Sequence, residues 1–211
     1  MDFQALGKIV SVNLRRNFIP HLLAAVIVMT ALTLLMGISA LNEVQAAQPI
    51  EMTMPLVGAI LLTPIFHPEQ DEAVRDVVRS KKTSYHAVCA VRVIYSVLFL
   101  ALLCGGFVSL MYLCESAVTL RHFVGGFASG LFLGSVGFFF AGISRNVIVG
   151  YMAAFIYYIA DFAFGKKLVL DMFSMRSAAD FNDPQIMTVK YLLIGTAVLL
   201  IVLCFVPVKK R

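Results

Sequence analysis

Long runs without charged residues are the feature that most limits what this chain can fold into. Residues 18–41 contain no Asp, Glu, Lys or Arg, and further apolar runs follow along the chain. A helix of about 20 apolar residues crosses the roughly 30 Å hydrocarbon core of a bilayer. Because 60% of the 211 residues are hydrophobic, a water-soluble fold could not cover them with polar side chains. The sequence therefore predicts an all-α, polytopic membrane protein without a sizeable soluble domain.

We expect six transmembrane helices in a single transmembrane domain, residues 1–211. The second helix has the weakest signal, because its apolar run, residues 52–66, is short and contains Pro55 and Pro64. It could extend back over residues 48–51 or cross at a tilt, and Glu43 and Glu51 make the loop before it acidic. Spans 1 and 2 are expected within residues 18–66, spans 3 and 4 within 88–143, and spans 5 and 6 within 147–211.

The distribution of positive charge predicts the orientation. With the N-terminus inside and six spans, 12 Lys and Arg residues face the inside and 5 face the outside. Loops on the cytoplasmic side carry the excess of these residues. Five spans would place the C-terminal Lys-Lys-Arg outside. We therefore expect a multi-pass protein of the cell (inner) membrane with both termini in the cytoplasm.

Two segments outside the spans have patterns of their own. As a helix, residues 2–17 carry an apolar stripe opposite a polar, basic one, which predicts an interfacial helix lying on the inner leaflet. A short cap packed on the protein itself is the alternative. Residues 165–190 are long for a plain turn and contain apolar residues, so we expect a segment that re-enters the outer face.

Residues 68–82 form the segment most suggestive of a protein partner. Its first turns are acidic and its last turn is basic, which complements the helix macrodipole. As a helix it has a narrow face of alanine and valine opposite a face of ion pairs. We predict a short amphipathic helix in the cytoplasmic coupling segment 67–87, between spans 2 and 3. Its small apolar face suits a protein groove better than lipid, and a solvated helix without a partner is the alternative.

This stretch resembles the cytoplasmic coupling segment of the ABC type-2 transporter permeases, the membrane subunits of ATP-binding-cassette exporters. Residues 71–74 (DEAV) and 76–80 (DVVRS) stand at matching steps, with Ala73 where glycine is usual and Lys81 where proline is usual. The family's layout is also similar: an interfacial helix, six spans and a re-entrant outer segment. The resemblance implies ATPase coupling by Glu69, Asp71, Glu72, Ala73, Val74, Arg75, Asp76, Val77, Val78 and Arg79.

The resemblance implies a permease subunit that exports its substrate by alternating access. The chain has no G-x-x-x-x-G-K-[ST] loop, so a separate ATPase subunit would bind the ATP, and we expect no cofactor on this chain. The expected partners are that ATPase, a second copy or a paralogous permease, and the lipid bilayer, but not nucleic acid. A hydrophobic or amphipathic peptide is the first expectation for the substrate. No catalytic or metal-binding motif is present, and a non-transport membrane scaffold or assembly protein is the alternative.

Three glycines recur at every fourth position of span 4, a spacing that lets helix backbones approach closely, either within one subunit or between two. They are Gly126, Gly130 and Gly134.

Two charged residues stand out within the apolar runs. Asp161 is the only acidic residue well inside an expected span. It either contacts substrate or anchors the outer end of span 5 by pairing with Lys166 or Lys167. Arg92 is expected to extend to the inner headgroups.

Overall fold

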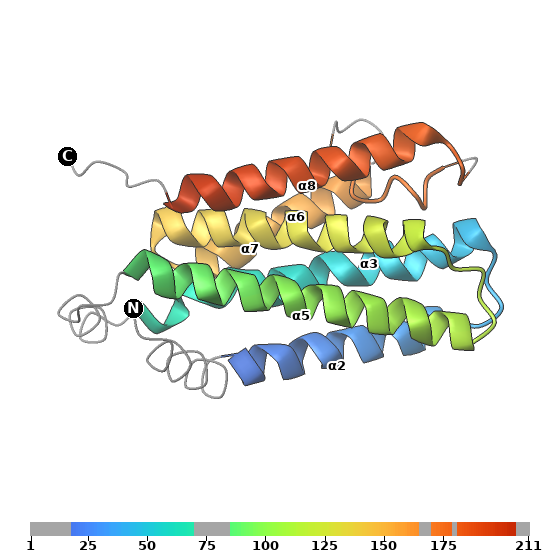
Figure 1. The fold of residues 1–211 in the computed structure, drawn as a ribbon, viewed down its shortest axis with the longest axis horizontal. Helices are drawn as coiled ribbons and strands as arrows, with labels where there is room; N and C mark the ends of the chain where they lie inside the picture. Colours follow the sequence, from blue (N-terminus) through green and yellow to red (C-terminus); the bar gives the residue numbers. More distant parts are fainter. Residues whose placement is uncertain (1–17, 70–84, 165–169, 179–180, 206–211) are drawn as a thin grey trace.

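The computed structural model describes residues 18–69, 85–164, 170–178 and 181–205, which form an all-helical bundle (Figure 1). Six of the described helices are long and apolar enough to cross a membrane, which confirms this part of the prediction. They run back and forth along one axis, and a short 3₁₀ segment, η2 (Thr63–Glu69), continues the second. The helices are α2 (Ile19–Met36), α3 (Glu43–Leu62), α5 (Tyr85–Leu113), α6 (Leu120–Ser144), α7 (Val147–Phe164) and α8 (Pro184–Phe205).

Two predicted elements fall outside the described residues. The interfacial helix expected over residues 2–17 lies entirely outside them. The amphipathic helix expected over residues 68–82 lies outside them from residue 70 onward, and Glu69 is the last residue of η2. Both elements therefore remain predictions.

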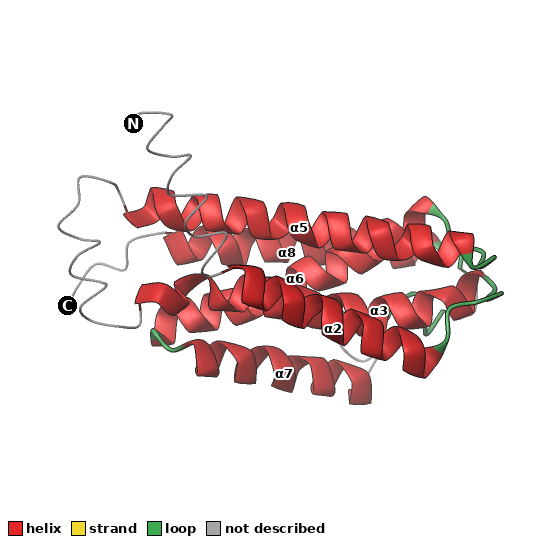
Figure 2. Ribbon diagram, turned by 90° about the horizontal axis from the view of Figure 1, so that it is seen from below, coloured by secondary structure: helices red, strands yellow, loops and turns green. Residues whose placement is uncertain are grey.

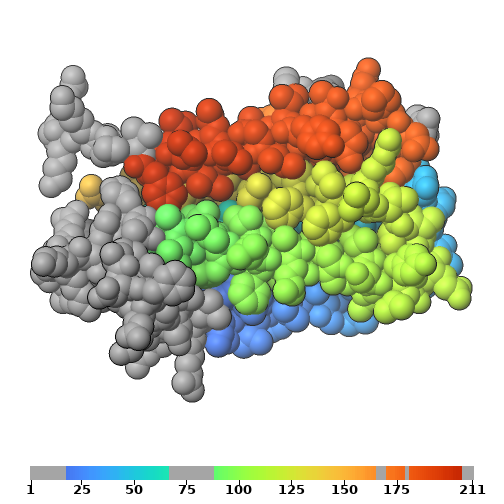
Figure 3. Space-filling model, viewed as in Figure 1, coloured from blue at the N-terminus to red at the C-terminus, as the bar shows by residue number. Residues whose placement is uncertain are grey.

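Helices α3 and α6 form the centre of the bundle. In the most apolar 18-residue stretch of each spanning helix, 78% of the residues are buried for α3 and 72% for α6. The corresponding share is 6% to 28% for the other four spanning helices. Helices α5 and α7 lie on opposite faces of this central pair (Figure 2). On the face shown in Figure 3, α6 is seen between α5 and α8. The outer helices carry many exposed leucines, isoleucines and phenylalanines, as expected of surfaces that face lipid.

Small residues bring the two central helices into backbone contact. A Cβ atom on Gly58 of α3 would collide with the carbonyl of Gly130 on α6. A Cβ atom on Gly134 would lie 2.6 Å from the carbonyl oxygen of Gly58. A Cβ atom on Gly126 would meet the side chain of Ile50 at 2.5 Å. All three glycines singled out on span 4 therefore face α3 of the same chain, where there is no room for a side chain.

Helix α3 is longer than its apolar run indicated. It begins at Glu43 behind an Asn42–Gln45 capping box and continues through Pro49 and Pro55. Proline is tolerated inside a membrane helix because neighbouring helices and side chains can satisfy the freed backbone groups. Glu51 consequently lies within the helix, fully buried, and not in an acidic loop.

Each end of the bundle collects alternate connections. Residues 37–42, 114–119, 170–178 and 181–183 lie at one end, on the right in Figure 1 and called here the right-hand end. Residues 63–69 and 145–146 lie at the other, left-hand end, where α2 begins and α8 finishes. At the right-hand end the Ala40 amide donates to the Cys114 carbonyl at 3.0 Å, and the Ala117 amide donates to the Leu41 carbonyl at 2.8 Å.

Candidate functional site

The most unusual site in the bundle is a buried pair of opposite charges near the right-hand end. Glu51 projects from α3 and Lys190 from α8, and neither side chain is exposed. The Lys190 Nζ atom lies 2.6 Å from Glu51 Oε1. Isolated charges are expensive within a membrane helix and are found facing a partner or a cavity. Each of these two charges supplies the partner that the other needs.

The remaining hydrogen-bonding capacity of Lys190 is used on neighbouring oxygens. Its Nζ atom donates to the carbonyl of Met172 at 2.6 Å and to the hydroxyl of Ser129, on α6, at 2.9 Å. The Ser129 hydroxyl in turn donates to the same Met172 carbonyl at 3.0 Å. An ammonium group has three protons, so these two contacts and Glu51 satisfy it completely.

Glu51 binds the polypeptide backbone as well as Lys190. Its Oε1 atom accepts a hydrogen bond from the amide of Met175 at 3.0 Å, and its Oε2 atom accepts one from the amide of Arg176 at 2.8 Å. Hydrogen bonds to an ionised acceptor are stronger than those between neutral groups. Through this carboxylate the central helix holds two consecutive residues of the α7–α8 connection.

Helix α7 supports the preceding part of the same connection. The Oδ2 atom of Asp161 accepts a hydrogen bond from the amide of Met172 at 2.8 Å, and the Tyr157 hydroxyl donates to the carbonyl of Leu170 at 3.0 Å. Asp161 is fully buried, and its Oδ1 atom has no hydrogen-bond partner within the part of the chain that the structure describes.

Together these contacts explain why charged residues are buried here. Residues 170–176, called here the 170–176 segment, contain no α-helix, yet Met172, Phe173 and Met175 are buried against the bundle. Backbone amides and carbonyls of such a segment need partners, because neither lipid nor apolar side chains can supply hydrogen bonds. The side chains of Glu51 and Lys190, with those of the neighbouring helices, supply them. Side chains from α3, α6, α7 and α8 thus form a polar cluster that holds the irregular 170–176 segment through hydrogen bonds.

A second group of hydrogen bonds between connections, centred on His122, lies at the right-hand end. The Nδ1 atom of His122 accepts a hydrogen bond from the Thr119 amide at 3.0 Å, and its Nε2 atom lies 2.8 Å from the Glu43 carbonyl. Because an amide donates and a carbonyl accepts, these partners assign the neutral tautomer with the proton on Nε2. The His122 ring also stacks on Phe181 with centroids 4.3 Å apart. One side chain therefore joins three connections.

The structure separates the residues predicted to carry function. Glu69 lies at the left-hand end, and residues 71–79 lie beyond the described part of the chain. The three glycines of α6 face α3, as described above. Asp161 lies in the cluster, bonded to the Met172 amide, whereas Lys166 and Lys167, its expected partners, fall outside the described residues.

Sequence reasoning missed Glu51, Lys190 and Ser129 as site residues. The apolar run of span 2 begins at residue 52, and that of span 6 begins at residue 191. Each run begins immediately after a charged residue, so the sequence pattern assigns Glu51 and Lys190 to the expected outer loops. The available signal was that the two charges are opposite in sign and that both border spans on the same expected side. Ser129 gave no signal, because serine is common in packed membrane helices.

Comparison of the chain with models of known protein families, with curated proteins and with solved structures found no match. The site is therefore interpreted from its own geometry. Among the described residues, no group of three or more His, Cys, Asp or Glu side chains could hold a metal ion, and none of the four cysteines is in a disulfide. The arrangement positions and fastens segments of the bundle.

Proposed function

We propose that this chain is the permease subunit of an ATP-binding-cassette exporter, placed in the inner membrane with both termini in the cytoplasm. A separate ATPase subunit drives it. The observation that carries the proposal is the course of α3. This central helix carries Glu51 of the buried Glu51–Lys190 pair near the right-hand end, and η2 continues it to Glu69 at the left-hand end, after which most of the charged segment 68–82 follows in the sequence.

The left-hand end supports mechanical coupling. The 3₁₀ segment η2 continues α3 without a break and leads directly into the charged segment. The Nη1 atom of Arg92, on α5, donates to the carbonyl of Ile65, in η2, at 2.9 Å. Because α3 and α5 flank the charged segment and are joined by this bond, a force on that segment acts on both helices.

The right-hand end supports transmission of that force. Helix α3 packs against α6 through backbone contacts at Gly58 and Gly130, which leave no flexible side chains between the two helices at this point. We therefore expect α3 and α6 to move together. Near the other end of α3, Glu51 holds the amides of Met175 and Arg176. Displacement of α3 by an ATPase therefore shifts or releases the 170–176 segment at the opposite face, as alternating access requires.

The remaining features of the proposal are those expected of such a subunit. It pairs with a second copy or a paralogous permease, and its substrate is a hydrophobic or amphipathic peptide. Because α2 begins and α8 finishes at the left-hand end, the described helices are compatible with two termini on one side. The excess of Lys and Arg that the six-span topology assigns to that side supports its placement in the cytoplasm.

The proposal is tested by purifying the tagged chain from its native membranes in a mild detergent. We expect vanadate-sensitive ATP hydrolysis in the purified sample, together with a second polypeptide that contains a G-x-x-x-x-G-K-[ST] sequence, identified by mass spectrometry. Charge reversal by Glu72→Lys with Asp76→Lys should remove both signals by reversing charges on the docking helix. Wild-type protein that purifies without an ATPase would instead favour the scaffold alternative.

Glu115→Lys is the matched control for this experiment. Glu115 is an exposed acidic residue in the connection between α5 and α6, at the right-hand end. The variant makes the same kind of charge change on the opposite face, so the ATPase should still copurify. Loss of ATPase from this control as well would show that charge reversal disrupts the protein in general.

A further inference from the structure

An apolar groove, called here the α2–α7 groove, opens between α2 and α7 over the central helices α3 and α6. Figure 2 looks onto this side of the bundle, with α7 drawn below α2. The volume of the groove is about 320 Å³, within the range of about 300–1,000 Å³ that is typical of small-molecule sites. The groove is therefore large enough for a ligand. Its lining residues are Val28, Leu56, Ala59, Ile60, Leu133, Tyr151, Met152, Ala154 and Phe155.

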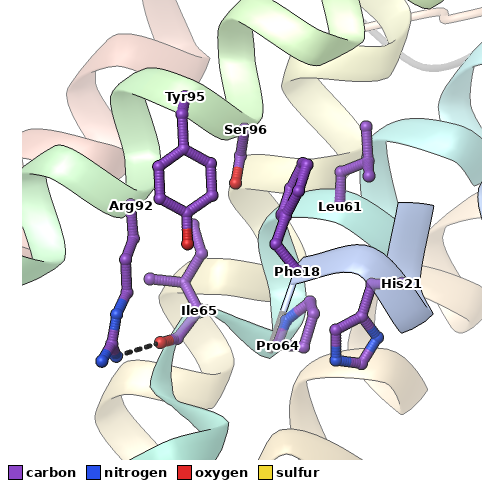
Figure 4. A pocket seen from close by; sticks show the side chains of 8 residues that line it. All are labelled: Phe18, His21, Leu61, Pro64, Ile65, Arg92, Tyr95 and Ser96. Carbon is purple, nitrogen blue, oxygen red and sulfur yellow. Dashed lines mark hydrogen bonds between the residues drawn. The ribbon is translucent and has the colours of Figure 1, made fainter. Parts of the chain in front are cut away.

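A much smaller hollow lies at the left-hand end, between the start of α2, the α3–η2 junction and α5 (Figure 4). Its volume is about 20 Å³, which holds about one water molecule. The buried hydroxyl of Ser96 lines this hollow and has no hydrogen-bond partner among the described residues. Because one water molecule would satisfy that hydroxyl, the small hollow does not indicate a larger ligand.

The lining of the α2–α7 groove favours an apolar occupant. Among the nine described residues that line it, Tyr151 alone has a polar side chain, and none is charged. A charged or strongly polar group placed here would lose its hydration and could gain a side-chain hydrogen bond from Tyr151 alone. The part of a ligand that enters the groove is therefore hydrocarbon.

The size of the groove favours a slender chain over a helix. One turn of an α-helix, about 5.4 Å long and about 10 Å across with its side chains, occupies roughly 420 Å³. Since this exceeds the volume of the whole groove, a helix of a second copy could cover the mouth but could not lie inside. Met152 and Phe155, which line the groove from α7, are each 55% exposed, so the groove opens onto the apolar outer surface of the bundle.

The position of the groove along the bundle places it within one leaflet. Tyr151 and Phe155 lie four and eight residues after the start of α7 at the left-hand end, and Val28 lies nine residues after the start of α2. At about 1.5 Å per residue, these positions are about 6–14 Å from the left-hand ends of their helices. One leaflet contributes about half of the roughly 30 Å hydrocarbon core. The groove is thus at the depth of the acyl chains of the leaflet at the left-hand end.

We propose that the α2–α7 groove binds one acyl chain of a membrane phospholipid from this leaflet. The methylene groups pack against Leu56, Ala59 and Ile60 on α3 and against α7, while the headgroup stays at the left-hand surface. Helix α2 gains most from this chain, because Ala25 is its only buried residue. A bound acyl chain adds apolar contacts between α2 and the rest of the bundle. The inference goes beyond the proposed function, because it holds whatever the protein transports.

The test uses the full chain in vesicles of phosphatidylcholine, of which a small share carries a photoreactive diazirine near the middle of one acyl chain. After illumination, mass spectrometry of peptides maps the residues that carry lipid adducts. Leu56 and Ile60 report occupancy of the groove, because they line it and are half-buried on the central helix α3. Leu98 on α5 is 64% exposed and reports contact with bulk lipid. We expect adducts at all three positions.

Variants that fill the groove make the result specific. Val28→Phe adds a ring to the lining and should lower the adducts at Leu56 and Ile60 by about fivefold to tenfold relative to those at Leu98. Ile27→Phe is the matched control, because this neighbouring residue of α2 is 67% exposed and does not line the groove. Its adducts should match those of the wild type. Ala59→Leu fills the groove from α3 and should act as Val28→Phe does, which provides a second test if one variant does not fold.

Three results would overturn the proposal. The first is a wild-type protein with adducts at Leu98 but none at Leu56 and Ile60. The second is an equal yield at Leu56 and Ile60 in the wild type and in the variants that fill the groove. The third is a yield at these two positions that falls, relative to Leu98, as the protein-to-lipid ratio rises, which would identify a second copy as the group that covers the groove.

Discussion

The Nζ atom of Lys190 lies 2.6 Å from the Oε1 atom of Glu51, although the two residues are 139 positions apart in the sequence. The pair joins the central helix α3 to the last helix, α8, and both side chains are fully buried. Lys190 donates a hydrogen bond to the Met172 carbonyl, and Glu51 accepts hydrogen bonds from the amides of Met175 and Arg176. The pair is therefore best understood as the support of an irregular backbone segment inside an apolar bundle.

Removing one charge of this pair should strongly destabilise the protein. Lys190→Met leaves the Glu51 carboxylate buried without its counter-ion, a change that costs about 3–5 kcal/mol in buried pairs. The measurement is the free energy of unfolding in mixed micelles as dodecyl sulfate is added. The double variant Glu51→Gln with Lys190→Met should be destabilised by less than the sum of the two single variants, because neither charge is then left alone.

Arg176→Met is the comparison for this experiment. Arg176 lies in the same region, half-buried, with its guanidinium carbon 4.7 Å from the centre of the Phe162 ring. Loss of this contact should cost only about 0.5–1 kcal/mol. Equal effects of Arg176→Met and Lys190→Met would contradict the special role given to the buried pair.

A methyl group added between the central helices should also be destabilising. In Gly134→Ala the new Cβ atom would lie 2.6 Å from the Gly58 carbonyl oxygen, and a backbone atom cannot move aside as a side chain can. We expect a loss of about 1–3 kcal/mol in the same unfolding measurement. Gly106→Ala on α5 is the control, because a Cβ atom there meets nothing within 4 Å. It should be neutral or stabilising by up to about 1 kcal/mol. Similar losses in both variants would contradict the close-packing account.

Replacing the imidazole at the right-hand end should loosen three connections together. His122→Phe keeps a ring that can stack on Phe181 but removes the acceptor for the Thr119 amide and the donor to the Glu43 carbonyl. We expect a loss of about 1–3 kcal/mol and faster hydrogen exchange at the Thr119 amide. Unchanged exchange at that amide would show that the hydrogen bond assigned to Nδ1 is absent.

The long apolar runs allowed the sequence to predict the architecture. Because each run has only one stable form within lipid, the six helices follow from composition and length, and α7 begins at residue 147, as predicted. The spacing of Gly126, Gly130 and Gly134 marked a close contact but did not identify its partner. That partner, α3, was the helix with the weakest apolar signal, since its prolines and Glu51 are those of a helix buried by protein and not by lipid.

The polar cluster could not be predicted because its members are supplied by separate helices. Glu51, Ser129 and Lys190 make sense only around the backbone of residues 172–176, whose irregular path has no local sequence signature. Arg92 was expected to extend to the headgroups, and the structure instead places it 6% exposed against η2. The unpartnered hydroxyl of Ser96, one turn further along α5, depends on packing that no pattern reveals.

Reporter fusions test the proposed orientation. Alkaline phosphatase, which is active only outside the cytoplasm, should be inactive when fused after residue 211 and active when inserted after Glu115. A fluorescent protein that folds only in the cytoplasm should give the opposite result at the same two positions. An active phosphatase at the C-terminus would contradict both the six-span topology and the assignment of the left-hand end to the cytoplasm.

The central claim is that an ATPase subunit binds the charged segment 68–82. Photo-crosslinking in native membranes tests this claim most directly. A photoreactive amino acid is placed at Val77, on the predicted apolar face, and for comparison at Glu115 at the other end of the bundle. The account predicts an adduct from position 77, and none from position 115, with a polypeptide that contains a G-x-x-x-x-G-K-[ST] sequence. Adducts from position 77 with lipid alone, or none at all, would contradict it.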